Sequence, residues 1–136
     1  SLLICKNPDA KTLERNDGEV QDFIHMDGRN VFKFATKVLV STVHELLERN
    51  NISLDDIDYI VCHQANERII DKASRDLDFP MDKMYLNISK YGNTSAASVP
   101  LAIDEAIREK KIKKGDTFLT IAFGGGLTWA GALVKY

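Results

Sequence analysis

The chain has 136 residues, of which 44% are hydrophobic and 28% are charged, as is ordinary for a globular domain with one core. Its 18 basic and 20 acidic residues leave a formal net charge of −2, so the chain as a whole lacks the positive charge that attracts nucleic acid. It contains no run of about 18 apolar residues, which excludes a membrane-spanning helix. Its two cysteines, Cys5 and Cys62, lie far apart, and we expect free thiols and a cytoplasmic location.

The first part of the chain predicts a long connection followed by helices and short strands. Residues 6–28 are rich in Asn, Asp and Gly and have few apolar anchors, which predicts a surface connection. Apolar residues at steps of three and four predict an amphipathic helix over residues 29–50. A β-branched and aromatic run predicts a buried strand at residues 58–62. A second helix is expected over residues 66–77, and residues 84–86 are a short strand candidate.

The second part of the chain predicts one helix and two strands. The helix should cover about residues 94–110, beginning at a Thr-Ser pair that can cap it, although Pro100 could move its start later or make the first turn irregular. Residues 117–123 and 127–134 predict two strands that are close enough to pair antiparallel. Alternating helices and strands predict an α/β layered fold with a mixed, mostly parallel sheet and a closing antiparallel pair.

Three segments that can carry chemistry follow predicted strands: His63, Asn93 and the glycines 124–126. Functional loops of open α/β sheets lie beyond the carboxyl ends of the strands, so we expect these segments to converge on one cleft. Taken singly, each has a structural alternative. The histidine could hold its loop by a hydrogen bond, the asparagine could be a turn or cap residue, and the glycines could form only a β-turn.

Four segments form a recognisable set when they are considered together: residues 26–33, 62–70, 91–100 and 122–131. In order and spacing they resemble the C-terminal half of 3-oxoacyl-[acyl-carrier-protein] synthase III. The resemblance implies a thiolase-like fold, in which two similar halves pack around a buried site. Residues 29–136 would form most of the second half, and residues 1–28 would be a connecting segment and strand end from the N-terminal half, which is missing here.

The resemblance also implies roles for individual residues. Members of the family join an acyl-CoA primer to malonyl-acyl carrier protein with loss of carbon dioxide, and both thioesters are substrates, so neither a cofactor nor a metal is implied. His63 and Asn93 would be catalytic, because each can donate a hydrogen bond to the thioester oxygen on which negative charge develops. The backbone N–H of Gly125 would contribute to the oxyanion hole. Asn66 would meet the pantetheine arm, and Phe123 would pack beside the nucleophile unless it is only a buried strand aromatic.

Three basic residues, Lys33, Arg68 and Arg75, would receive the acidic carrier protein, unless they are only solvated charges on helix faces. The family's nucleophilic cysteine lies in the N-terminal half. Neighbouring residues at a strand end point to opposite faces, so Cys62 should face away from a cleft that holds His63. The chain alone is therefore expected to be an inactive part of an acyltransferase.

Two further interpretations stay open. The chain could belong to a related condensing enzyme of secondary metabolism that uses another acyl chain, or to a non-catalytic thioester-binding module. In the full-length protein the resemblance implies a homodimer, with acyl-CoA and acyl carrier protein as partners and no contact with nucleic acid or membrane. A half-domain should also expose apolar surface where the missing half packs.

Overall fold

The structure is a computed structural model that describes Leu3–Ile4 and residues 25–136. Strand β1 (Leu3–Ile4) pairs antiparallel with strand β2 (His25–Met26). Most of the connection predicted over residues 6–28 lies outside the described residues. At its end, residues 25 and 26 form a strand rather than a loop, because their backbone groups pair with β1.

Helix α1 (Gly28–Asn50) confirms the first predicted helix. The Asp27 carboxylate caps its start by accepting a hydrogen bond from the backbone N–H of Asn30 at 3.2 Å. Asn51 ends the helix in the left-handed conformation, with φ of 52°. Between these caps the apolar residues repeat at helical spacing and form a buried stripe, which includes Ala35, Val38, Leu39, Val43 and Leu47.

The central sheet has the order β3–β4–β5 and is mixed. Strand β3 (Tyr59–Cys62) runs parallel to β4 (Thr117–Gly124), and β4 pairs antiparallel with β5 (Thr128–Lys135). The closing antiparallel pair was predicted from the sequence. The prediction of a mostly parallel sheet is wrong for this sheet, because four residue pairs are parallel and eight are antiparallel. Residues 84–86 were predicted as a strand and are not one, since only Met84 forms an isolated parallel bridge, with Ile60.

Three helices connect β3 to β4: α2 (Glu67–Leu77), α3 (Ile88–Tyr91) and α4 (Ser98–Arg108). Helix α2 matches its prediction. Helix α4 begins later than predicted, after a 3₁₀ turn at Ser95–Ala97. Pro100 lies in the first turn of α4, where a missing N–H removes no helical hydrogen bond. Helix α3 has four residues and was not predicted, because so short a helix shows no periodicity.

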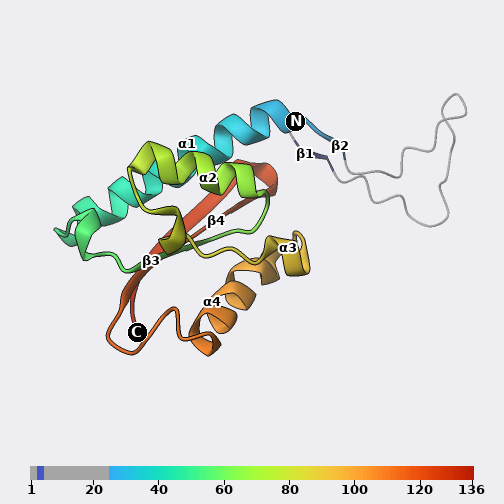
Figure 1. Cartoon of the computed structure of the whole chain (residues 1–136). Coiled ribbons are helices and arrows are strands. Elements are labelled where there is room, and N and C mark those ends of the chain that lie inside the picture. Colours follow the sequence, from blue (N-terminus) through green and yellow to red (C-terminus); the bar gives the residue numbers. More distant parts are fainter. Residues whose placement is uncertain (1–2, 5–24) are drawn as a thin grey trace, which may run out of the picture.

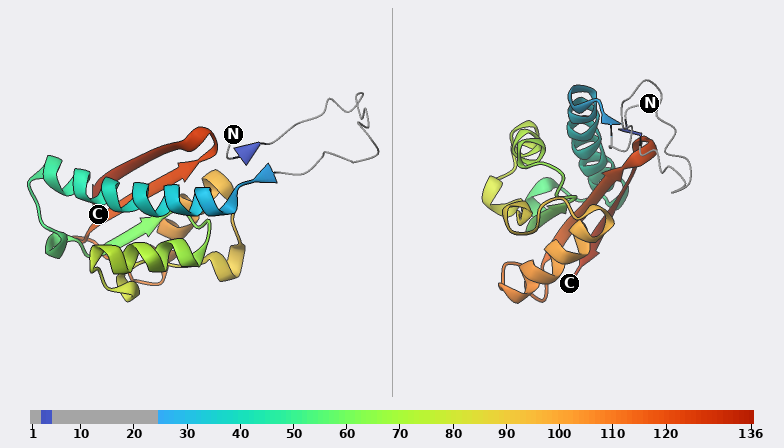
Figure 2. Two further views of the ribbon diagram at one scale, coloured as in Figure 1. Left: turned by 90° about the horizontal axis from the view of Figure 1, so that it is seen from above. Right: turned by 90° about the vertical axis from the view of Figure 1, so that its right-hand side faces the viewer.

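The elements form three layers, with α1 and α2 side by side on one face of the sheet and α4 on the other (Figures 1 and 2). Strand residues alternate accordingly: Ile60 and Cys62 pack with the α1–α2 cluster, whereas Val61 packs with α4. Gly131 lets β5 approach α1 closely, because a Cβ atom there would lie 2.5 Å from Cγ2 of Thr42.

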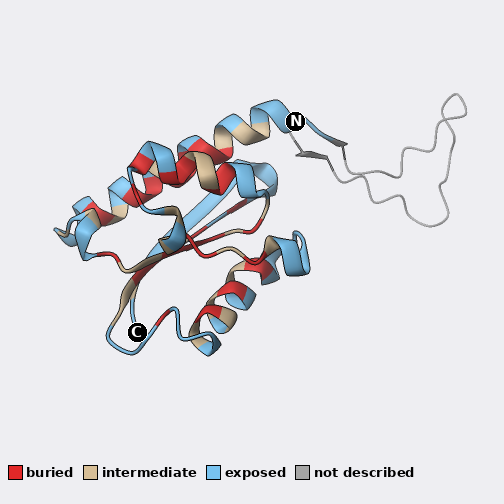
Figure 3. Cartoon of the chain, viewed as in Figure 1, coloured by how far each residue is buried: buried red, intermediate tan, exposed pale blue. Residues whose placement is uncertain are grey.

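Strand β5 is largely exposed, as the pale blue colour of Figure 3 shows along the hairpin. Five consecutive residues at its start, 128–132, are solvent-exposed, and Trp129 keeps 53% of its surface accessible. None of the helices in the described part of the chain is long and apolar enough to cross a membrane.

Candidate functional site

A cavity of about 610 Å³ lies where β3 and β4 end. His63 reaches it directly after β3, Asn93 reaches it from the loop between α3 and α4, and Phe123 and Gly125 reach it at the end of β4. The structure thus brings four of the residues singled out in the sequence to one cavity, at the carboxyl ends of the parallel strands.

His63 is held by Ser98, the first residue of α4. The Nδ1 atom of His63 lies 2.5 Å from Oγ of Ser98, and the same hydroxyl oxygen accepts a hydrogen bond from the backbone N–H of Gln64 at 3.3 Å. Ser98 is only 2% exposed, so its own proton needs an acceptor within the protein. Nδ1 is that acceptor, which leaves the ring proton of neutral His63 on Nε2.

Burial lowers the pKa of His63 below its ordinary value of 6.5, so the ring is neutral at pH 7. The imidazole also packs edge-on against the ring of Phe123, with centroids 5.2 Å apart and planes at 79°. Together these contacts hold a neutral ring whose Nε2–H can act as a hydrogen-bond donor.

Asn93 is oriented in a similar way. Its side-chain Oδ1 accepts a hydrogen bond from the backbone N–H of Ser95 at 3.0 Å. Because the oxygen is engaged, the Nδ2 amide group is the part of the side chain left to donate. The acceptor atoms of His63 and Asn93 are therefore both occupied by residues at the start of the α4 segment, and both side chains keep a donor.

The glycine segment forms a tight turn between β4 and β5. Gly126 has φ of 78°, a left-handed conformation that favours glycine. The hydroxyl of Thr128 donates a hydrogen bond to the carbonyl oxygen of Gly125 at 3.2 Å, which fixes the orientation of the turn. The oxyanion role of the Gly125 N–H stays a prediction.

The remaining candidates lie outside the cavity lining. Asn66 caps helix α2, because its Oδ1 accepts a hydrogen bond from the backbone N–H of Arg68 at 2.9 Å. Arg75 pairs with Asp71 of the same helix at 2.7 Å. Within the described residues the exposed side chains of Lys33 and Arg68 form no ion pair. Of the three basic candidates, these two keep a charge that is free for a partner.

Cys62 lies in the core and does not line the cavity. Burial raises the pKa of its thiol to about 12, so the reactive thiolate is scarce at neutral pH. This agrees with the expectation that Cys62 faces away from the site. The sequence reasoning missed Ser98, whose contact with His63 joins residues 35 positions apart.

Comparison with known proteins identifies relatives of this chain. The family model for the C-terminal part of 3-oxoacyl-[acyl-carrier-protein (ACP)] synthase III matches residues 47–136. The beta-ketoacyl-[acyl-carrier-protein] synthase III of Caldanaerobacter subterraneus subsp. tengcongensis is 55% identical over 113 residues, which are 83% of this chain and 34% of that protein.

Two solved structures extend the likeness to the fold. The crystal structure of the corresponding synthase III from Thermus thermophilus has a TM-score of 0.86 and 39% identity, covering 99% of this chain and 41% of that one. The priming beta-ketosynthase from the R1128 polyketide biosynthetic pathway has a TM-score of 0.76 and 38% identity, covering 82% of this chain and 34% of that one.

A mixed sheet between helices, with its cavity at the ends of β3 and β4, defines the chain as a thiolase-like α/β protein. More narrowly, the chain belongs to the 3-oxoacyl-[acyl-carrier-protein] synthase III family and corresponds to its C-terminal part. The resemblance seen in the sequence and the predicted fold class are thereby confirmed. The chain spans about a third to two fifths of the length of the relatives it matches.

Proposed function

We propose that this chain is the part of an acyltransferase that catalyses the decarboxylation step. The full-length enzyme would start fatty acid synthesis by joining an acyl-CoA primer to malonyl-acyl carrier protein. The observation that carries this proposal is the pair of donors, His63 Nε2–H and Asn93 Nδ2, at one cavity. The direct test incubates the full-length protein with acyl-CoA and malonyl-carrier protein, and measures carbon dioxide and β-ketoacyl product. Failure to form both with any acyl-CoA would contradict the proposal.

In the proposed reaction, a cysteine thiolate elsewhere in the full-length protein attacks the acyl-CoA thioester and releases CoA as its thiolate, which leaves an acyl-cysteine. The bond between the malonyl carboxylate and its α-carbon then breaks. Its electron pair forms an enolate as carbon dioxide leaves, and the negative charge develops on the thioester oxygen. His63 and Asn93 would stabilise this oxygen with two hydrogen bonds that are oriented before the substrate arrives.

The enolate carbon then attacks the acyl-cysteine carbonyl, a carbon–carbon bond forms, and the cysteine leaves as thiolate. Throughout these steps His63 keeps its proton, because it acts as a neutral donor rather than as a base. Its lowered pKa supports this role. The backbone N–H of Gly125 would stabilise the oxyanion of the acyl-cysteine, and the ring of Phe123 would border the nucleophile.

We propose that the nucleophile comes from the rest of the protein, as the family resemblance implies, and the burial of Cys62 supports this. The exposed hairpin supports a missing half that covers it, because Trp129, which lines the cavity, is 53% exposed and Leu127, two residues earlier, is 38% exposed. We further propose a homodimeric full-length protein in the cytoplasm, where acyl-CoA and carrier protein are available.

The carrier protein would dock at Lys33 and Arg68, with Asn66 beside the pantetheine arm and Arg75 in a lesser role. Lys33→Glu and Arg68→Glu should weaken use of malonyl-carrier protein and leave priming by acyl-CoA unchanged, because a reversed charge repels an acidic protein. The measurements are kcat/KM for each substrate over a range of salt concentrations.

Lys111→Glu is the matched control, since Lys111 is also exposed but follows the far end of α4. It should leave both substrates unaffected. Carrier-protein kinetics that did not change in the Lys33 and Arg68 variants, with an unchanged salt dependence, would rule out this docking site.

Ser98→Ala should lower the decarboxylation rate about 3- to 10-fold, the amount expected for one lost neutral hydrogen bond. Without the hydroxyl, the ring of His63 can place its proton on either nitrogen, and only the Nε2–H form donates into the cavity. The ¹⁵N chemical shifts of the His63 ring should therefore move from a pure Nε2–H pattern to a mixture. Ser89→Ala, at an exposed position of α3, should change neither quantity. Unaltered ring shifts in Ser98→Ala would refute the tautomer assignment.

A second candidate is a priming condensing enzyme of secondary metabolism, which the 38% identity to the R1128 priming ketosynthase favours as the alternative. Turnover measured with a carrier protein of fatty acid synthesis and with one of secondary metabolism would distinguish the two functions. A non-catalytic thioester-binding module, the third interpretation, would bind malonyl thioester without releasing carbon dioxide.

A further inference from the structure

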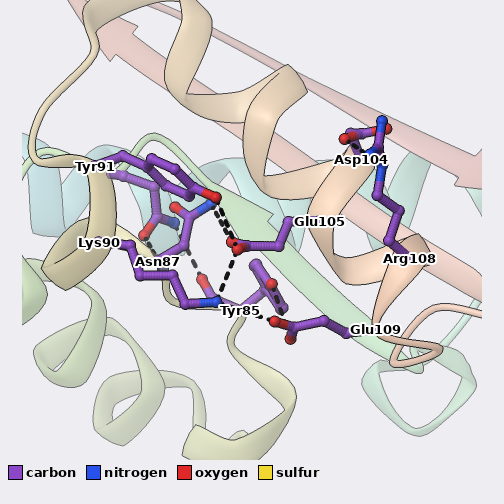
Figure 4. A network of polar contacts seen from close by, with 9 residues as sticks. Tyr85, Asn87, Lys90, Tyr91, Asp104, Glu105, Arg108 and Glu109 are labelled. Carbon is purple, nitrogen blue, oxygen red and sulfur yellow. Dashed lines mark hydrogen bonds and ion pairs between the residues drawn. The ribbon is translucent and has the colours of Figure 1, made fainter.

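Glu105 of helix α4 gathers three hydrogen-bond donors from the segment that precedes Asn93 (Figure 4). Its Oε2 accepts from the Nδ2 amide of Asn87 at 2.9 Å. Its Oε1 accepts from Nζ of Lys90 at 2.8 Å and from the hydroxyl of Tyr91 at 3.0 Å. These donors belong to α3 and its N-cap, and Tyr91 ends that helix two residues before Asn93. The Glu105 side chain is only 14% exposed, whereas its donors Lys90 and Tyr91 are 53% and 50% exposed.

Asn87 also links this cluster to the residue next to His63. Its backbone N–H donates to Oε1 of Gln64 at 3.0 Å, and Asn87 and Gln64 are only 4% and 1% exposed. The Gln64 amide donates in turn to the carbonyl oxygens of Cys62 at 2.9 Å and Tyr85 at 3.1 Å. A continuous line of hydrogen bonds therefore runs from the segment of His63 through Asn87 to Glu105.

Helix α4 is attached to both donor-bearing segments. Its first residue, Ser98, contacts His63, and Glu105, about two turns later, holds α3. Between Tyr91 and Asn93 stands Gly92, with φ of 68° and ψ of −162°, a conformation that L-residues rarely adopt. Glycine has wide backbone dihedral freedom, so Gly92 alone does not fix the position of Asn93. That position depends on the contacts that hold Tyr91 before it and on the turn at Ser95 after it.

We propose that Glu105 is a positioning residue, which sets the place of Asn93 relative to His63 by holding α3 against α4. The expected effect of Glu105 on catalysis rests on the proposed function, whereas its expected effect on the position of α3 and Asn93 does not. Hydrogen bonds from Lys90 and Asn87 hold the pKa of Glu105 at about 2, so the carboxylate is ionised wherever the enzyme would be assayed. A defect caused by losing Glu105 should therefore be the same throughout the neutral pH range.

The test compares Glu105→Ala with Glu109→Ala in the full-length protein. Glu109, the C-cap residue of α4, lies one turn after Glu105 and accepts hydrogen bonds from Lys90 and Tyr85, each at 3.1 Å, but accepts none from Asn87 or Tyr91. Glu105→Ala should lower kcat for malonyl decarboxylation on the order of 10- to 100-fold, because a displaced donor meets the developing charge poorly. KM and the rate of acyl transfer to the nucleophile should change little. Glu109→Ala should leave all of these unchanged.

Hydrogen exchange provides a measurement that needs no substrate. In Glu105→Ala the backbone amides of residues 91–97 should exchange faster, whereas in Glu109→Ala they should exchange as in the wild type. Unchanged exchange in Glu105→Ala would overturn the inference. So would equal loss of both half-reactions, which would indicate a general structural role. If the wild type has no activity, the proposed function fails, and exchange still decides the role of Glu105.

If Glu105→Ala does not fold, Tyr91→Phe combined with Lys90→Met removes two of the three donors and keeps the carboxylate. The same faster exchange at residues 91–97 is then expected. Wild-type exchange in this double variant would overturn the inference as well.

Discussion

Replacing His63 or Asn93 by alanine should lower malonyl decarboxylation on the order of 10²–10³-fold, the loss seen when one donor is removed from other oxyanion sites. Each substitution removes a donor from the cavity where the enolate oxygen would lie. Acyl transfer from acyl-CoA to the nucleophile should be less affected, since that step uses a different oxyanion. The measurement is release of carbon dioxide from malonyl-carrier protein, alongside mass spectrometry of the acylated enzyme.

Asn93→Asp provides a matched control for the first prediction. It keeps the size of the side chain and the acceptor for Ser95, but replaces the Nδ2 donor by an oxygen. It should therefore be at least as defective as Asn93→Ala, because the carboxylate also repels the negative charge that develops on the enolate oxygen. If the aspartate variant kept wild-type decarboxylation, or if both half-reactions fell equally, Asn93 would not be the donor assigned here.

Purified residues 1–136 should catalyse no condensation and should form no stable acyl adduct with acyl-CoA. Donors that stabilise an oxyanion cannot replace the thiolate that carries the acyl group between the half-reactions. Burial raises the pKa of the Cys62 thiol to about 12, so little of the reactive thiolate is present at pH 7. Mass spectrometry after incubation with acyl-CoA measures the adduct directly.

The full-length protein, treated in parallel, is the positive control. It should gain the mass of one acyl group, which would show that the reagents are active. An adduct on Cys62 of the isolated chain, with turnover that disappears in Cys62→Ser, would mean that this half carries its own nucleophile. The assignment of the chain as a dependent half would then be wrong.

Much of the fold could be predicted from the sequence because its main elements are marked by local patterns. The periodicity of residues 29–50 and 66–77 identified α1 and α2, and the apolar runs identified β3, β4 and β5. Residues 84–86 misled the prediction. There the backbone of Tyr85 bonds to Ile60 and to the side chain of Gln64, which is a tertiary arrangement that no local pattern reveals.

The site could be predicted only in outline. His63 and Asn93 were selected because each follows a predicted strand, and the structure does bring them to one cavity. The strand predicted before Asn93 is not formed, so Asn93 reaches the cavity from the loop between α3 and α4. The groups that orient them could not be predicted, since the contact of His63 with Ser98 depends on where α4 lies against β3. Glu105 gave no signal either, because a glutamate in a helix is ordinary until its three donors are seen.

Gly131 joins two parts of the site that lie far apart in the sequence. Its close approach to Thr42 lets helix α1 pack directly against strand β5 of the β4–β5 hairpin. Lys33 stands toward one end of that helix, and Gly125 stands at the tip of that hairpin. If the carrier protein docks at Lys33 as proposed, its separation from the glycine turn is therefore set in part by the packing of α1 against β5.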